Sequence, residues 1–160
     1  EMLNYELAMQ VAIEIIFGRS SAFYQEIYEN GWIDESYSAD FSMEQGYGFT
    51  MIGSDTVNPT ELNDKIKETI KHFASNWNVE EQDLQRIVRK KIGFFLRALN
   101  SIEYIANQFT RYSFNDMNLF HVVLALEKLT MDQVKSAFLS LADEDAHTVF
   151  TILPFEKQND

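Results

Sequence analysis

The first apolar stretch of the chain predicts a helix over residues 3–16 that is apolar on nearly every side. From Tyr5 onward, only Glu6, Gln10 and Glu14 carry a charge or an amide, and they recur every four residues. A helix with so narrow a polar stripe is buried over most of its surface. The sequence therefore predicts a largely buried first helix.

A second, shorter helix is expected over residues 22–30. Gly18 ends the first helix, and Ser20 or Ser21 stands where a hydroxyl can cap the next one. Gly31 is expected to stop it, because glycine readily adopts the left-handed conformation that follows many helices.

The pattern then changes to strict alternation, which predicts an antiparallel β-hairpin. The apolar positions of the first run are Tyr37, Ala39, Phe41 and Met43. Such alternation is typical of a half-buried strand. The turn falls at Gln45-Gly46, and a second run continues to Gly53. The apolar positions of the second run are Tyr47, Phe49 and Met51.

Capping signatures, in which a capping side chain is followed three residues later by an acid or amide, begin the remaining helices. These signatures are Asn58 with Glu61, Asn78 with Glu81, Asn100 with Glu103 and Thr130 with Gln133. The apolar spacing that follows predicts helices near residues 59–73, 81–99, 100–109, 118–126 and 130–141. Residues 148–153 return to strand composition, and Pro154 is expected to end that strand.

This order of elements predicts an α+β domain, a small antiparallel sheet with helices packed on one face. Residues 1–160 form a single unit, with no internal repeat and only two prolines. Three strands are few for so many helices, and the chain begins inside an apolar helix. We therefore expect that one or more first strands are missing and that the chain is a partial domain of a longer protein.

Composition excludes several classes of function. The 160 residues carry 13 basic and 25 acidic side chains, a net charge of −12 that disfavours nucleic acid as a partner. No apolar run approaches the roughly 20 residues that cross a bilayer, so no membrane partner is expected. With no cysteine, thiolate metal sites and disulfides are excluded. Glu1 and Glu6 replace the positive region of a signal peptide, which favours a cytoplasmic location.

Few residues carry a pattern that indicates chemistry. His72, His121 and His147 fit no zinc-ligand spacing, and packing or surface roles explain them. Asn107 and Arg111 lie four residues apart in a segment rich in amides and hydroxyls, and they could face a cavity. The alternative is an arginine placed near a helix C-terminus, where the helix dipole favours it.

Several short motifs together resemble a known family. Residues 15–27, read I-I-F-G-R-S-S-A-F-Y-Q-E-I, are similar to a segment of the inverted-zincin metallopeptidases, which include insulinase, pitrilysin and the mitochondrial processing peptidases. A turn at residues 31–36, the hairpin, Asn58-Pro59, residues 129–134 and a terminal Leu-Pro follow in the family's order. The runs F-G-R-S-S, A-L-N-S and Q-F-T-R-Y resemble bacterial processing-peptidase-like proteins of Gram-positive species most closely.

The resemblance implies a two-part architecture. Family chains are clamshells of two similar α+β halves around a chamber, with the zinc motif H-x-x-E-H in the N-terminal half. This sequence lacks the motif. The resemblance therefore implies a C-terminal-half domain that closes the chamber and helps to hold an extended peptide. It implies no cofactor in this chain, zinc in the missing half, and that half or a homologous subunit as partner.

The resemblance also marks candidate contact residues. In active relatives this half contributes an arginine and a tyrosine from an R-x-K-x-G-x-x-Y turn. Here Tyr28 occupies the arginine position, and the tyrosine position falls on Asp34 or Glu35, with Tyr37 nearby but out of step. The candidate chamber-facing residues are Tyr28, Asp34, Tyr37, Asn107 and Arg111.

Three functions remain open. In the first, the parent chain is a zinc endopeptidase in which water activated by zinc and a glutamate base act in the missing half. In the second, the parent is a degenerate, non-catalytic homologue that binds peptides or serves as a partner subunit. The third is an unrelated acidic helical adaptor. In each, this chain alone is expected not to hydrolyse peptides, and its incomplete sheet is expected to make it self-associate.

Overall fold

The computed structural model describes residues 1–153, which form seven α-helices and one two-stranded antiparallel sheet. The helices are α1 (Met2–Phe17), α2 (Ala22–Glu29), α3 (Pro59–Ser75), α4 (Glu81–Ala98), α5 (Ile102–Phe114), α6 (Val122–Glu127) and α7 (Met131–Leu139). The strands are β1 (Ser38–Glu44) and β2 (Tyr47–Gly53), and short 3₁₀ turns are η1 (Leu119–His121), η2 (Ser140–Ala142) and η3 (Glu144–Ala146). The α+β class is confirmed.

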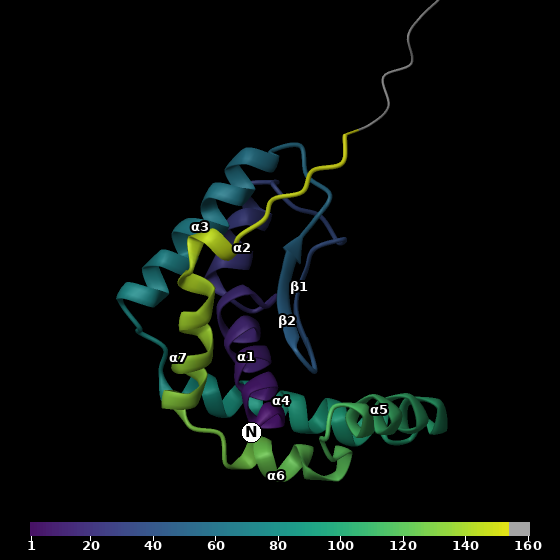
Figure 1. Cartoon of the computed structure of the whole chain (residues 1–160). Helices are drawn as coiled ribbons and strands as arrows, with labels where there is room; N and C mark the ends of the chain where they lie inside the picture. Colours follow the sequence, from purple (N-terminus) through teal and green to yellow (C-terminus); the bar gives the residue numbers. More distant parts are fainter. Residues whose placement is uncertain (154–160) are drawn as a thin grey trace, which may run out of the picture.

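Helix α1 lies at the centre of the fold, as its narrow polar stripe predicts. It contacts β1 on one side and α7, α4, α6 and α2 on others (Figure 1). Val11, Ala12 and Phe17 are completely buried, and even Glu6 is only 1% exposed. Because α1 fills the middle, the elements around it share one hydrophobic core.

The helix starts follow local capping chemistry in part. The Ser21 Oγ accepts a hydrogen bond from the Tyr24 backbone N at 3.0 Å, and Thr130 forms a complete capping box with Gln133. Asn58 stands at the cap position of α3 and Pro59 begins the helix, as predicted, but the Asn58 side chain makes no capping hydrogen bond. The predicted cap of α4 is wrong, because the helix begins after Glu80 instead of Asn78.

Helix α5 also begins one residue later than its signature predicts. Ser101 is its cap, accepting from the Tyr104 backbone N at 3.2 Å. Asn100 instead closes the preceding helix, because its Nδ2 donates to the Arg97 carbonyl at 3.1 Å. The helix then continues to Phe114, past the predicted end at Phe109.

The hairpin places its two apolar runs on opposite faces. The two-residue turn sets Glu44 opposite Tyr47, and Phe41 opposite Thr50. Phe41 therefore packs toward α1, where its ring meets that of Tyr5, with the two ring centroids 6.1 Å apart. The alternate residues of β2 point away from the helices, since residues opposite each other share a face. These outward residues are Tyr47, Phe49 and Met51.

The predicted last strand at residues 148–153 is not a strand. The segment has no regular structure, and the described part of the chain has two strands instead of the expected three. Strand composition favours extended backbone, but a strand also needs a partner for its hydrogen bonds, and this segment pairs with none. Pro154, expected as its end, lies outside the described residues.

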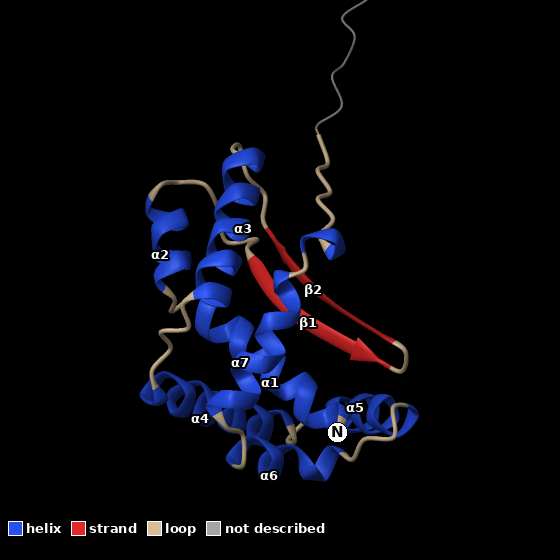
Figure 2. Cartoon of the chain, turned by 60° about the vertical axis from the view of Figure 1, so that its left-hand side comes forward, coloured by secondary structure: helices blue, strands red, loops and turns tan. Residues whose placement is uncertain are grey.

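The described helices lie on one face of the hairpin, as predicted. Figure 1 and Figure 2 show α1, α7 and α3 on the same side of the two strands, with α4, α5 and α6 below them. The turn at Gln45-Gly46 uses a glycine in the left-handed region, with φ of 88° at Gly46. Among residues 1–153, no helix combines the length and hydropathy needed to cross a bilayer.

Candidate functional site

The five candidate residues form two groups at opposite ends of the hairpin. Tyr28 is on α2, while Asp34 and Tyr37 lie in the connection from α2 to β1. Asn107 and Arg111 are on α5, where Arg111 contacts Glu44 next to the hairpin turn. A seven-residue strand spans about 20 Å, so the two groups are not one site.

The first group is joined by short local contacts. The Tyr37 hydroxyl donates to the Phe17 carbonyl at 2.8 Å, and the side chain is only 4% exposed. Burial raises the Tyr37 pKa well above its ordinary value, so the phenol keeps its proton. The Asp34 carboxylate accepts two hydrogen bonds from Ser36, one from the hydroxyl at 2.6 Å and one from the backbone N at 2.8 Å. These hydrogen bonds lower the pKa of Asp34.

Tyr28 and Asn107 remain at the surface. The Tyr28 side chain is 53% exposed and stacks on Tyr24, with ring centroids 5.7 Å apart. Asn107 lies on the exposed side of α5, one helical turn before Arg111. These two side chains are therefore open to a ligand, unlike the buried Tyr37.

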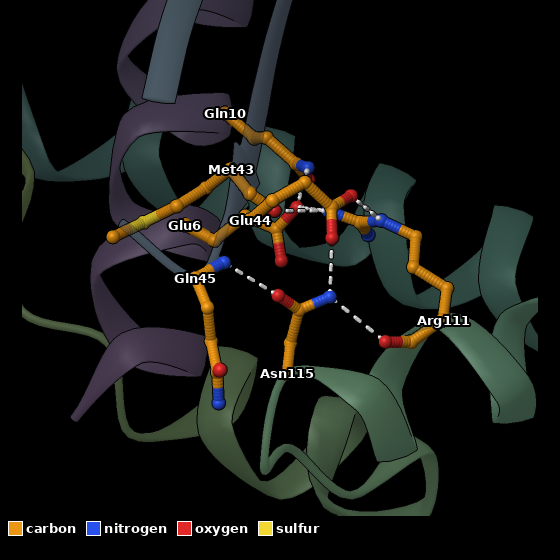
Figure 3. Close-up of polar contacts among 7 residues, drawn as sticks. All are labelled: Glu6, Gln10, Met43, Glu44, Gln45, Arg111 and Asn115. Atoms are coloured by element: carbon orange, nitrogen blue, oxygen red, sulfur yellow. Dashed lines mark hydrogen bonds and ion pairs between the residues drawn. The ribbon is translucent and has the colours of Figure 1, made fainter. Parts of the chain in front are cut away.

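Arg111 is the centre of the second group and does not point into a cavity. Its Nη2 donates to the Glu6 carboxylate at 2.7 Å and to the Met43 carbonyl at 2.7 Å, and its Nε donates to Glu44 at 2.8 Å (Figure 3). One side chain thus joins α1, β1 and α5. The guanidinium geometry suits such a forked arrangement, which a lysine does not reproduce.

Asn115, at the end of α5, completes this arrangement. Its Nδ2 donates to Glu44 and to the Arg111 carbonyl, and its Oδ1 accepts from the Gln45 backbone N at 2.7 Å. We call Glu6, Glu44, Arg111 and Asn115 the Arg111 network. It fastens the hairpin turn to the end of α5 (Figure 3).

The pKa values of the two carboxylates of the network are shifted in opposite directions. Burial raises the pKa of Glu6, and the hydrogen bond and charge of Arg111 only partly oppose this shift. Glu44 is one-third exposed, and hydrogen bonds from Arg111 and Asn115 lower its pKa. The Oε2 atom of Glu6 is buried and has no partner among the described residues. The pKa values of the two acids bound to one arginine are therefore shifted in opposite directions.

The sequence identified Arg111 but not its partners. Glu6 was visible as part of the polar stripe on the first helix, and such a stripe on a buried helix requires partners. The partner of Glu6 is Arg111, which lies 105 residues away in the sequence. The next acid of the stripe, Glu14, pairs with Lys90 at 2.5 Å, across 76 residues. Local periodicity cannot specify pairs at that separation.

The described residues do not offer a zinc site. No three histidine or acidic side chains among residues 1–153 are grouped as metal ligands. The Nε2 atom of His147 is 2.7 Å from the Leu141 carbonyl, and His72 packs against Phe73. An open pocket of about 470 Å³ lies between the start of α1 and residues 116–133, and none of the four residues of the Arg111 network lines it.

Comparison with known proteins gives a relative in sequence and a neighbour in fold. A zinc protease of Bacillus subtilis (strain 168), YmfH, itself described as uncharacterized, is 46% identical over 154 residues, 96% of this chain and 36% of the relative. A crystal structure of an M16-like peptidase from Alicyclobacillus acidocaldarius superposes with a TM-score of 0.77 at 22% identity. That match covers 86% of this chain and 33% of the other, and it shows the fold alone.

The chain thus spans about a third of the length of each of these proteins. Residues 3–91, more than half of the chain, match the family described as the peptidase M16 inactive domain. The matched range contains α1, α2, the hairpin, α3 and the first half of α4. The family resemblance of the sequence is confirmed, and the chain belongs to the peptidase M16 inactive-domain family.

Proposed function

We propose that this chain is the non-catalytic half of a zinc-dependent endopeptidase, in which it forms one wall of a closed chamber. The observation that carries this proposal is the match to an inactive peptidase domain, beside a relative named as a zinc protease. The zinc ion and the glutamate base belong to the N-terminal half of the longer polypeptide. This chain alone binds no zinc and hydrolyses no peptide.

Within the wall, we assign direct peptide contact to the exposed candidates, Tyr28, Asp34 and Asn107. Tyr37 and Arg111 act as positioning residues, because their polar atoms are engaged inside the domain. Tyr37 holds the start of β1 against the end of α1, and Arg111 holds α5 beside the hairpin turn. Fixed elements of this kind lower the entropic cost of binding an extended peptide.

The remaining properties follow from the same proposal. Residues 1–160 are one partial domain, and the partner is the N-terminal half of the same polypeptide or a homologous subunit. The location is the cytoplasm, which suits a chain with no cysteine and therefore no need of an oxidising compartment.

The test compares the full-length polypeptide of the parent gene with the 160-residue chain. Zinc content and hydrolysis of short unstructured peptides are measured on both. We expect about one zinc ion per full-length chain, hydrolysis by that chain only, and neither property in the 160 residues. Peptide binding without zinc or hydrolysis in the full-length polypeptide would instead identify a non-catalytic binding subunit. Hydrolysis by the 160 residues alone would contradict the proposal.

A further inference from the structure

Helix α4 carries a glycine at the centre of its exposed side. The helix contacts α1 and α6, and its buried residues are Leu84, Ile87 and Phe95. Gly93 lies nine residues beyond Leu84, about two and a half helical turns, and therefore faces the opposite direction. It is exposed, and a Cβ atom added to it would meet no other element of the domain within 4 Å.

Nothing inside the domain requires this glycine. Glycine in the interior of a helix is less favourable than almost any other residue, because it loses the most conformational freedom on folding. The glycines with positive φ among the described residues are Gly31 and Gly46, so Gly93 is not needed for its backbone conformation. A glycine is also found where another backbone approaches closely. Here the space is open, so such a backbone has to come from outside residues 1–153.

The side chains around Gly93 are mostly cationic. Residues three and four positions away on a helix are neighbours on its surface, and residues seven positions away share the same side. All of these neighbours are exposed, and we call them, together with Gly93, the Gly93 face: Arg86, Arg89, Lys90, Leu96 and Arg97. The face holds four cations and no acid, in a chain with a net charge of −12.

The acids of the domain neutralise only part of this charge. Arg86 and Lys90 have acidic partners within the domain, at 3.3 and 2.5 Å. No acidic side chain among residues 1–153 forms an ion pair with Arg89 or Arg97. Three of the five arginines of the chain lie on this face. Arginine is enriched where proteins bind one another while lysine is depleted, and its planar guanidinium binds a carboxylate through two parallel hydrogen bonds.

We propose that the Gly93 face binds an acidic helix in the part of the longer polypeptide outside these 160 residues. The two backbones approach most closely at Gly93, where no side chain separates them, and the carboxylates of the bound helix lie beside Arg89 and Arg97. The charge of the face specifies an acidic occupant. The rest of the polypeptide supplies its source, because the chain spans only 36% of the zinc protease it matches. The proposal rests on the proposed function only in requiring that longer polypeptide.

The geometry of α4 favours a helix over an extended strand as the occupant. Backbone groups in the interior of a helix are hydrogen-bonded to one another, so α4 offers none to a strand. Two helices instead pack through their side chains, with axes about 8–10 Å apart depending on the residues at the contact. Gly93 allows the shorter separation. We therefore expect a small residue at the centre of the bound helix and acidic residues about one turn to either side.

The reactivity of introduced thiols in the full-length polypeptide tests this proposal. The 160 residues contain no cysteine, so Leu96→Cys places one thiol on the Gly93 face, and Ser136→Cys places the control thiol on the exposed side of α7. Peptide mass spectrometry follows the reaction of each position with a maleimide. We expect position 96 to react at least about tenfold more slowly than position 136, because the bound helix covers it. Without an occupant, the neighbouring arginines would favour the thiolate and speed the reaction.

Charge reversal and added bulk should both release the bound helix. Arg89→Glu combined with Arg97→Glu should bring the rate at position 96 to within about twofold of the control, although the new acids alone disfavour the thiolate. Lys135→Glu, at an exposed cation of α7, is the matched control and should leave position 96 slow. Gly93→Leu should also restore fast reaction by blocking close approach, and it cannot act by weakening α4, since leucine favours helix more than glycine does.

Four outcomes would overturn the proposal. Equally fast reaction at positions 96 and 136 would show that the face is open in the full-length polypeptide. Slow reaction that charge reversal leaves unchanged would exclude an acidic occupant. Slow reaction that is relieved by dilution would make a separate molecule the occupant, and slow reaction relieved by nuclease would make it a nucleic acid. None of these outcomes depends on zinc or hydrolysis, so this test is separate from that of the proposed function.

Discussion

At the scale of single residues, the Arg111 network shows how a buried charge is kept in this fold. Glu6 is 1% exposed, and its ionised form depends on one guanidinium supplied by α5. Removing one member of a buried ion pair leaves the other uncompensated, which costs far more than breaking a surface pair. The network is therefore a point at which single substitutions have large effects.

Replacing Arg111 by methionine tests this reasoning. We expect Arg111→Met to lower the free energy of unfolding by about 3 kcal/mol, because it leaves Glu6 buried without its cation. The matched control is Lys71→Met, which breaks the surface pair with Glu144 and should have a far smaller effect. Urea unfolding measures both variants. Equal effects of the two substitutions would show that the network contributes no more than a surface pair.

The two acids of the network should give opposite pH dependence. The pKa of Glu6 is raised in the folded state, so its contribution to stability is present below its ordinary value of 4.5 and is lost as the pH rises through the folded pKa. Glu44 has a lowered pKa, so its contribution is present above 4.5 and is lost as the pH falls.

Urea unfolding of Glu6→Gln and Glu44→Gln between pH 3 and 7 measures these contributions. Relative to wild type, Glu6→Gln should gain stability as the pH rises above 4.5, since glutamine resembles the protonated acid. Glu44→Gln should recover towards wild type as the pH falls below 4.5. Parallel pH profiles of the two variants would contradict a raised pKa for Glu6 together with a lowered pKa for Glu44.

At the scale of elements, the hairpin separates what alternation predicts from what it leaves open. Alternation identifies both strands, but it does not say which face is covered. In β1 the alternating apolar residues face α1, while in β2 the alternating residues Tyr47, Phe49 and Met51 face outward because the turn fixes the register. The same alternation of apolar residues thus marks the buried face of β1 and the exposed face of β2.

Two phenylalanine substitutions check the faces. In dilute 160-residue chain, Phe41→Ala should lower the free energy of unfolding by about 3 kcal/mol, because Phe41 is buried against Tyr5 and α1. Phe49→Ala should cost less than about 1 kcal/mol, since its side chain is half exposed. Thermal or urea unfolding measures both losses. A larger loss of unfolding free energy for Phe49→Ala than for Phe41→Ala would mean that the strand register is shifted by one residue.

Most of the fold could be predicted from the sequence, because helices, caps and hairpins depend on neighbouring residues. The buried first helix, the hairpin and the capping box at Thr130 are local features of this kind. Residues 148–153 could not be assigned in the same way, because strand pairing depends on a distant partner. The Arg111 network was missed for the same reason, since Glu6 and Arg111 lie 105 residues apart.

At the scale of the whole molecule, the open edge of β2 makes the isolated chain incomplete. No strand of the described residues pairs with the outer side of β2, and Tyr47, Phe49 and Met51 are exposed beside it, so this edge is available to a second copy. Antiparallel pairing of two β2 strands about Thr50 would extend the sheet through uncharged residues only. The isolated chain is therefore expected to self-associate, even though its net charge opposes association.

Sedimentation over a range of concentrations tests this expectation. The 160-residue chain should move from monomer to dimer or larger species as its concentration rises, and Phe49→Lys should shift it back to monomer by placing a charge on the edge strand. Val57→Lys adds the same charge at an 87% exposed position before α3 and should have little effect. A monomer at every concentration would argue against an accessible edge.

The central claim is that this domain acts only as a wall for chemistry performed elsewhere in a longer polypeptide. The most direct measurement is hydrolysis of short peptides by the full-length polypeptide with and without the residues of this chain, with zinc content measured alongside. The proposed function predicts that removing this half abolishes most hydrolysis while the remaining half still binds zinc. Undiminished hydrolysis after its removal would contradict that claim.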